Sequence, residues 1–213
     1  MRSSLRAPKP HAKAKTLLQS ADPRMSDAQA TSHSRGGTRV PRPAAFLDRD
    51  GVLNIDRGYV YRPADLEWVP GAPEAVRLLN EAGYYVLVIT NQSGVARGFY
   101  DEAAVQRFHA HMRKRIEAAG AHIDAFYYCP HHPQGVVREL AVRCRCRKPE
   151  TGMLEQAASE WPIERERSFL IGDKDDDMTA AARFGIRGVK FDARSDSLLE
   201  IVRREIARGS GRQ

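Results

Sequence analysis

Cysteine is scarce in this 213-residue chain, and the few that occur lie within 18 residues of one another. They are Cys129, Cys144 and Cys146. This number and this grouping exclude the disulfide framework of a small secreted domain. In a reducing compartment, cysteines grouped in this way indicate a metal site or a catalytic role.

The chain also lacks any apolar run long enough for a signal peptide or a membrane span. We therefore expect a soluble, cytoplasmic protein with no membrane partner. At this length the chain can form one domain with a single core.

Aromatic residues are missing from residues 1–43, which are rich in Ser, Ala, Arg and Pro. This segment holds 9 Lys and Arg against 2 Asp and Glu, whereas the rest of the chain carries 25 of each. A segment with so little apolar surface cannot offset the entropy cost of ordering. We therefore expect a disordered basic N-terminal tail over residues 1–43 and one domain over residues 44–213.

Four interpretations of the tail remain open. It is a flexible extension, an artefact of an upstream start with Met25 as the true first residue, a transit peptide, or a nucleic-acid-binding arm. The last is the least favoured, because the tail has no aromatic side chain to stack on bases. We expect no nucleic-acid partner.

From residue 44 onward, short apolar runs alternate with helical patterns. This alternation predicts an α/β fold with a doubly wound, mostly parallel sheet that has helices on both faces. The expected strands are residues 44–47, 84–89, 123–128, 167–173 and 187–191, and the expected helices are residues 73–83, 101–120, 152–161, 176–185 and 195–208.

Polar residues directly follow three of these strands. Asp48 and Asp50 come after the first strand, Thr90 and Asn91 after the second, and Asp173 after the fourth. Ligands of parallel sheets bind beyond the carboxyl ends of the strands, so this placement is typical of an enzyme site. Three acids that converge there would repel one another unless a cation joined them, and carboxylate oxygens suit Mg2+.

Four segments, in order, resemble the four motifs of the haloacid dehalogenase superfamily of phosphatases. They are FLDRDGVLN, ITNQSG, CRKP and LIGDKDDD, and the resemblance spans residues 44–192. It implies a haloacid dehalogenase-like, Rossmann-like fold. It also implies phosphoryl transfer in two steps, through an aspartyl phosphate.

The resemblance assigns a role to each residue of these motifs. Asp48 would attack phosphorus, and Asp50 would act first as general acid and then as general base. Catalytic Mg2+ would be held by Asp48, Asp173 and the backbone carbonyl of Asp50. Thr90 would bind a phosphoryl oxygen, and Lys148 would offset charge in the transition state.

Three further acids stand close behind Asp173 in the sequence. We expect Asp175 and Asp176 only to favour a helix N-terminus, where acids are common. Asp177 lies four residues after Asp173 and would act as a supporting residue that orients either the metal or Lys148.

The cysteines form a C-x-H pair and a C-x-C pair with twelve residues between them. The candidate ligands Cys129, His131, Cys144 and Cys146 form a closed set that is typical of structural Zn2+. Metal-free buried thiols, a redox pair and a nucleic-acid finger are less favoured, because C-x-C is not C-x-x-C and a proline follows instead of a basic helix. His131 is favoured over its neighbour His132 by the C-x-H register. No role is assigned to the remaining histidines, which are expected in the tail or on helix surfaces: His11, His33, His109, His111 and His122.

Within the superfamily, CPHHP…CRCRKP resembles the D,D-heptose 1,7-bisphosphate phosphatases, whose zinc loop lies beside an otherwise uncapped site. This resemblance implies a minimal cap and a sugar phosphate substrate that loses its 7-phosphate, in the synthesis of activated heptose for lipopolysaccharide and other cell-surface glycans. Arg147 would bind the second phosphate bidentately, and Lys174 would add charge. The implied substrate-binding residues are Asp56, Arg57, Gly58, Tyr59, Thr90, Asn91, Gln92, Ser93, Arg147, Lys148 and Lys174.

Two other functions remain open. Histidinol-phosphate phosphatases share the paired ligands with a shorter stretch between them, so histidinol phosphate or another small phosphate monoester is an alternative substrate. A non-enzymatic zinc module with a nucleic-acid-binding tail is the second alternative, although such a module does not need the catalytic acids and lysine. We expect a monomer, because no helix has an obvious interface face.

Overall fold

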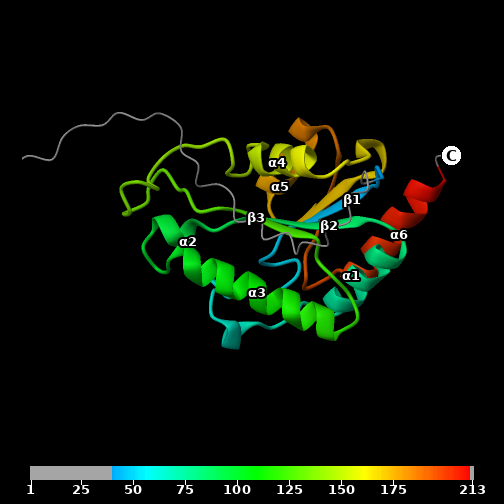
Figure 1. The fold of residues 1–213 in the computed structure, drawn as a ribbon, viewed down its shortest axis with the longest axis horizontal. Helices are drawn as coiled ribbons and strands as arrows, with labels where there is room; N and C mark the ends of the chain where they lie inside the picture. Colours follow the sequence, from blue (N-terminus) through cyan, green and yellow to red (C-terminus); the bar gives the residue numbers. More distant parts are fainter. Residues whose placement is uncertain (1–39, 212–213) are drawn as a thin grey trace, which may run out of the picture.

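Parallel strands form a five-stranded sheet in the computed structural model, which describes residues 40–211 (Figure 1). The strand order is β3-β2-β1-β4-β5, so the direction in which strands are added reverses between β1 and β4. The bounds are Ala44–Leu47 for β1, Tyr85–Asn91 for β2, Ala125–Cys129 for β3, Phe169–Gly172 for β4 and Arg187–Lys190 for β5.

The central strands are buried on both faces. Phe46 of β1 points into one core, and its neighbour Leu47 points into the other. In β2, Leu87 and Val88 divide between the same two cores. Side chains of a strand alternate between faces, and both faces here are apolar, which is why these strands read as unbroken apolar runs.

Helices cover the two faces of the sheet. They are α1 (Ala72–Glu81), α2 (Ser93–Ala96), α3 (Glu102–Ala118), α4 (Gly152–Glu160), α5 (Asp175–Phe184) and α6 (Leu198–Ser210), with the 3-10 turns η1 (Pro63–Asp65) and η2 (Arg165–Arg167). The apolar faces of α1, α3 and α6 share one core, and those of α4 and α5 share the other. Figure 1 shows the resulting three layers, with the sheet between the two groups of helices.

Polar and glycine residues set several helix ends. The side chain of Asp101 accepts a hydrogen bond from the backbone N–H of Ala104 at 2.7 Å and caps the start of α3. Ser197 caps α6 in the same way through Glu200 N–H, at 3.4 Å. Gly185 ends α5 in the left-handed conformation, with a φ of 82°.

The predicted α/β fold with a doubly wound parallel sheet is confirmed by this topology. All five expected strands and five expected helices are present, with ends that differ by a few residues. No pattern in the sequence predicts α2, η1 or η2, because three or four residues are too few to show a helical period. None of the helices between residues 40 and 211 is long and apolar enough to cross a membrane.

The expected tail falls, as far as residue 39, outside the described residues, and so do Met25, His11 and His33. Residues 40–43 are described, and Arg42 already contacts the domain. Its backbone N–H donates to the Pro162 carbonyl oxygen at 3.1 Å, and its own carbonyl accepts from Glu164 N–H at 2.9 Å.

The burial of β2 on both faces of the sheet leads to a prediction about stability. Leu87 is fully buried, so Leu87→Ala removes buried methyl groups and leaves a cavity. We expect the free energy of unfolding to fall by about 2–5 kcal/mol, measured by urea denaturation followed by circular dichroism. Val136 is 78% exposed. Val136→Ala is therefore the control and should stay within about 0.5 kcal/mol of wild type; equal midpoints for the two variants would contradict the prediction.

Candidate active site

The two central strands place acids side by side at the carboxyl edge of the sheet. β1 pairs with β4, and Asp48 and Asp173 directly follow their last residues. The strand order reverses at this point, which is where parallel α/β sheets bind ligands. Gly51 permits the close approach of the two loops: its φ is 88°, and a Cβ there would lie 2.7 Å from Oδ2 of Asp173.

Lys148 forms a buried ion pair with an acid of the loop after β1 and with an acid at the start of α5. Its Nζ lies 2.9 Å from Oδ1 of Asp48 and 2.5 Å from Oδ1 of Asp177, and it donates to the Ile89 carbonyl oxygen at 2.9 Å. Burial opposes the charge of the lysine, but Asp48 and Asp177 outweigh burial, so the pKa of Lys148 is raised. The ammonium group therefore stays charged beside Asp48.

Asp48, Asp173 and Asp177 each offer an oxygen, and these oxygens lie within 4.8 Å of one another. Burial raises the pKa of Asp48 to about 7, although Lys148 acts in the opposite direction, and burial also raises the pKa of Asp173. Oδ1 of Asp173 is buried and has no hydrogen-bond partner among residues 40–211. Acids that are crowded, desolvated and incompletely partnered fit a divalent cation with oxygen ligands, such as Mg2+.

Asp177 already has partners for both of its oxygens. Oδ1 faces Lys148, and Oδ2 accepts from the backbone N–H of Lys174 at 3.0 Å. Gly172 allows this packing, because a Cβ at that position would clash with the Asp177 side chain. This arrangement fits the predicted supporting role of Asp177 and leaves Asp48 and Asp173 as the side chains that would hold Mg2+.

Three side chains hold the carboxylate of Asp50. Nη2 of Arg49 donates to Oδ1 at 3.0 Å and to Oδ2 at 2.8 Å. Asn54 donates to Oδ1 and Gln92 donates to Oδ2, each at 3.0 Å. Gln92 also donates to Oγ1 of Thr90 at 2.9 Å, so it links two predicted catalytic residues. With both oxygens occupied, Asp50 has its backbone carbonyl left for a metal.

Two residues at this site were not predicted from the sequence. Arg49 received no role, and His109 was expected on a helix surface, which is wrong: both are buried. Nη1 of Arg49 lies 3.3 Å from Nε2 of His109, whose ring stacks on Phe126 of β3. His109 shares a helical face with Val105 and Met112, at spacings of four and three residues, and this pattern could have indicated its burial.

The predicted zinc ligands meet at the end of β3. Sγ of Cys146 lies 3.2 Å from Sγ of both Cys129 and Cys144, and 3.3 Å from Nδ1 of His131. These separations are too long for a disulfide. They approach the edge of about 3.8 Å of a tetrahedron with Zn–S bonds of about 2.3 Å. A hydrogen bond from Cys129 lowers the pKa of Cys146 to about 5, so the cluster already favours one thiolate, and the set fits Zn2+.

His132 lies outside this cluster, in agreement with the preference for His131. Its Nε2 is 3.1 Å from Nη2 of Arg97, and its Nδ1 accepts from the backbone N–H of Gln134. His132 thus connects the cysteine loop to the residue that follows α2.

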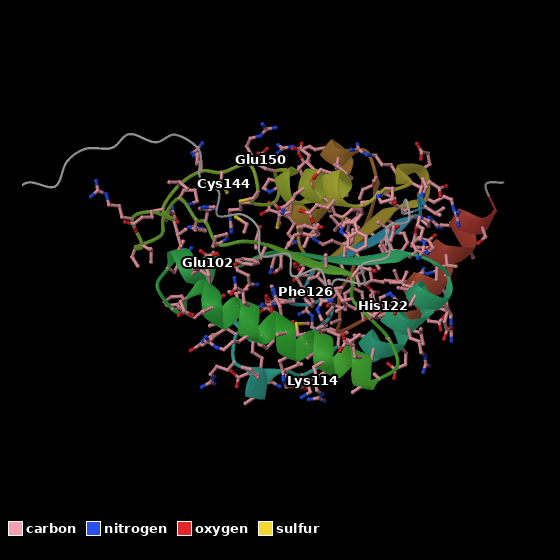
Figure 2. The ribbon with its side chains drawn as sticks, viewed as in Figure 1. Glu102, Lys114, His122, Phe126, Cys144 and Glu150 are labelled. Atoms are coloured by element: carbon pink, nitrogen blue, oxygen red, sulfur yellow. The ribbon has the colours of Figure 1, made fainter. Side chains whose placement is uncertain are left out.

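The segment after the last cysteine is fixed from two directions. Asn91 donates to the Lys148 carbonyl oxygen and accepts from the Lys148 N–H, both at 3.0 Å. Arg147 donates to the His131 carbonyl oxygen at 3.4 Å. Figure 2 shows Cys144 and Glu150 in the loop before α4 that carries this segment. Asn91, predicted to bind substrate, therefore has its side-chain amide occupied by the backbone of Lys148.

The loop after β1 reaches the loop after β4 through a pair of charges. Oδ2 of Asp56 lies 3.5 Å from Nζ of Lys174, which is also 3.7 Å from Oδ2 of Asp173. Oδ1 of Asp56 accepts from the backbone N–H of Gly58 at 2.8 Å and stabilises the turn. The structure thus brings the predicted residues Asp56 and Lys174 together beside Asp173.

The other predicted residues of this loop have different partners. Arg57 forms an ion pair with Glu67, and both are exposed. Tyr59 has a φ of 54°, and its ring meets that of Phe99 at 4.6 Å between centroids. An open hollow of about 900 Å3 lies here, bordered by residues 57–62, 64–67 and Phe99.

The buried state of His109 makes part of the stability depend on pH. Burial, followed by the charges of Arg49 and Arg113, holds the pKa of His109 well below 6.5. The unfolded chain therefore takes up a proton below pH 6.5 that the folded protein does not, and stability is lost as pH falls. We expect this group to cost wild type up to about 1.4 kcal/mol of unfolding free energy per pH unit, and His109→Gln to lose less. Urea unfolding at about pH 7.5 and 5.5 measures the difference, and equal losses would contradict it.

Comparison with known proteins identifies relatives over most of the chain. A HAD-hydrolase-like family model matches residues 145–191. D-glycero-beta-D-manno-heptose-1,7-bisphosphate 7-phosphatase of Rhodopseudomonas palustris is 48% identical over 71% of this chain and 84% of its own length. The enzyme of the same name from Escherichia coli K12 is 44% identical over 65% of this chain and 73% of its own length.

Two solved structures agree with these relatives. A HAD-like phosphatase from Mesorhizobium loti has a TM-score of 0.71 and 31% identity, over 82% of this chain and 91% of that one. D,D-heptose 1,7-bisphosphate phosphatase from B. bronchiseptica, solved with magnesium and phosphate, has a TM-score of 0.65 and 27% identity, over 78% of this chain and 99% of that one. With the strand-end acids, the buried lysine and this extent of identity, the chain belongs to the D-glycero-D-manno-heptose 1,7-bisphosphate 7-phosphatase family of HAD phosphatases.

Proposed function

We propose that this chain is a Mg2+-dependent phosphatase that removes the 7-phosphate of D-glycero-β-D-manno-heptose 1,7-bisphosphate. The observation that carries the proposal is the group of buried Asp48 and Lys148 with partly buried Asp173 at the strand-order reversal, in a chain 48% identical over 151 residues to an enzyme of that name. The β anomer follows the names of the relatives, because the sequence alone does not distinguish the anomers.

The reaction begins with attack on the 7-phosphate by a carboxylate oxygen of Asp48. A bond forms between this oxygen and phosphorus, and the bond between phosphorus and O7 of the sugar breaks. Asp50 gives its proton to the leaving sugar oxygen. Water then attacks the aspartyl phosphate, Asp50 accepts a proton from this water, and Asp48 is released together with inorganic phosphate.

Mg2+ would be held by Asp48, Asp173 and the backbone carbonyl of Asp50, and when bound it neutralises phosphate charge so that an anionic nucleophile can approach. Lys148 supplies a second positive charge from within the protein, 2.9 Å from Asp48. Thr90 places its hydroxyl, which accepts from Gln92, at the end of β2 to donate to a phosphoryl oxygen.

Arg147 and Lys174 would recognise the second phosphate of the substrate. They lie in different loops, one after the cysteine cluster and one after β4, so they offer positive charge at two points of the site rim. A guanidinium can bind a phosphate through two parallel N–H groups, and a lysine adds charge without fixed geometry. This placement of two cations suits a bisphosphate, because its second phosphate must be kept apart from the phosphate that reacts.

Zn2+ would bind Cys129, His131, Cys144 and Cys146 as a structural ion that fixes the loop before Arg147 and Lys148. We further propose that the enzyme is cytoplasmic. We also propose that it works as a monomer, because a single chain supplies every group that the proposed mechanism uses. Light scattering of the purified protein tests the monomer, and a dimer mass would contradict it.

Substrate comparison tests the proposed function. We expect kcat/KM for the β anomer of the heptose bisphosphate to exceed that for the α anomer and for histidinol phosphate by at least about tenfold, measured as phosphate release with Mg2+. Asp48→Asn should fold, as judged by circular dichroism, and lose more than about a thousandfold in kcat because it has no nucleophile. A preference for histidinol phosphate would overturn the substrate, and a near-normal rate for Asp48→Asn would overturn the mechanism.

Zinc removal tests the role of the cysteine cluster. We expect Cys144→Ser, which removes a ligand, to lose zinc by metal analysis and to raise KM for the heptose bisphosphate by about tenfold as the loop loses its order. The Mg2+ concentration for half-maximal activity should stay within about twofold, because the acids lie on other loops. His132→Ala is the matched control and should keep its zinc. An unchanged KM in verified zinc-free protein would contradict the prediction.

A further inference from the structure

Among the described residues, Arg49 is the largest side chain that is fully buried. It is a cation, and in the sequence it lies between two catalytic acids. Removing a guanidinium from water costs stability unless its donors find partners. The partners of Arg49 are therefore informative about the reason for its burial.

One nitrogen of Arg49 serves three acceptors. Nη2 donates to both carboxylate oxygens of Asp50 and to the Val60 carbonyl oxygen at 2.6 Å. Rotation of the Asp50 carboxylate away from its present plane would break at least one of these bonds. The Val60 carbonyl belongs to the loop that also carries Asp56, so Arg49 fixes that loop against Asp50.

The other side of the guanidinium is held by α3. Nη1 lies 3.3 Å from Nε2 of His109, and the guanidinium carbon lies 4.7 Å from the ring centre of Phe108. His109 is held in turn by Phe126, with ring centroids 4.6 Å apart at an angle of 19°. Because the imidazole is neutral, its Nε2 can accept from Arg49, with the ring proton on Nδ1.

We propose that Arg49 is a positioning residue that, supported by His109, fixes the Asp50 carboxyl group for proton transfer to the leaving oxygen. The inference rests on the aspartyl-phosphate mechanism proposed above. Proton transfer needs the acid within hydrogen-bond reach of the leaving atom, so small displacements of Asp50 lower the rate. Asn54 and Gln92 each hold one oxygen of Asp50, whereas Arg49 holds both.

A leaving-group comparison separates positioning from plain structural support. The sugar leaves as an alkoxide and needs the proton from Asp50, whereas nitrophenolate from p-nitrophenyl phosphate leaves without one. Since kcat/KM covers the steps through the first phosphoryl transfer, it reports the acid role of Asp50 and not its later role as base. Both substrates are assayed on the same preparation, so the fraction of folded enzyme cancels in their ratio.

The variants are chosen along α3. His109→Leu removes the acceptor for Arg49, and we expect it to lower kcat/KM about tenfold for the heptose bisphosphate but no more than about twofold for p-nitrophenyl phosphate. His109→Gln places an amide oxygen near the position of Nε2 and should recover most of the loss. Ile116→Ala weakens the core two turns further along the same helix and should lower the melting temperature without changing the ratio. Arg49→Lys keeps the charge but cannot reach both Asp50 and His109, and should resemble His109→Leu.

The results of these assays support or contradict the positioning role of Arg49. Equal losses on both substrates in His109→Leu, or a ratio for Ile116→Ala that changes as much, would overturn the positioning role while leaving the proposed function intact. A wild-type enzyme that hydrolyses neither substrate would overturn the proposed function, and the inference with it. A selective loss for the sugar phosphate that is restored by His109→Gln would support the inference.

Discussion

The buried ion pair of Lys148 with Asp48 and Asp177 is the interaction on which the catalytic site depends. It joins three separate parts of the chain: the end of β1, the start of α5 and the loop after the cysteine cluster. Charges removed from water cost several kcal/mol each, and loss of one partner of such a group costs about 3–5 kcal/mol. A lysine that is 3% exposed therefore depends on these two acids to keep its charge. Several neighbouring features serve this need: Gly172 makes room for Asp177, and Asn91 pairs with the backbone of Lys148.

Under the proposed mechanism, the two acids that follow β1 show how environment separates the roles of identical side chains. Asp48 is buried, faces a lysine and shares its space with other acids, so burial raises its pKa and a cation is needed to keep it ionised. Asp50, two residues later, is bonded by neutral amides and by an arginine that lies behind it. The first arrangement suits a nucleophile that works with a metal, and the second suits an acid whose position matters more than its charge.

The fold and the positions of the acids could be predicted from the sequence for the same reason. Buried parallel strands are continuous apolar runs, and the residues that follow them must lie at one edge of the sheet, so Asp48, Asp50 and Asp173 could be placed together from their order alone. The four residues of the cysteine cluster could be predicted as a group because the C-x-H and C-x-C pairs are each local in the sequence. The contact of Arg49 with His109 joins residues sixty positions apart and depends on how α3 lies across the sheet, which no local pattern specifies. The surface ion pair of Arg57 with Glu67 likewise depends on the directions of the two side chains, which the spacing of residues in the sequence does not determine.

The cysteine cluster takes the place of a hydrophobic core under the loop that precedes Arg147 and Lys148. No residue from His131 to Arg145 is buried, so this loop cannot be ordered by apolar contacts. Its backbone has a few bonds to the end of α2, where the Ala96 carbonyl oxygen accepts from Val136 and Val137. Ligation of structural Zn2+ is worth about 10 kcal/mol or more in small peptides, which exceeds what these bonds can give. Arg147 and Lys148 directly follow Cys146, the last proposed ligand, so zinc bound there would also order these two cations. Under the proposed function, recognition of the second phosphate would depend on the zinc, whereas the acids proposed to hold Mg2+ depend on the sheet.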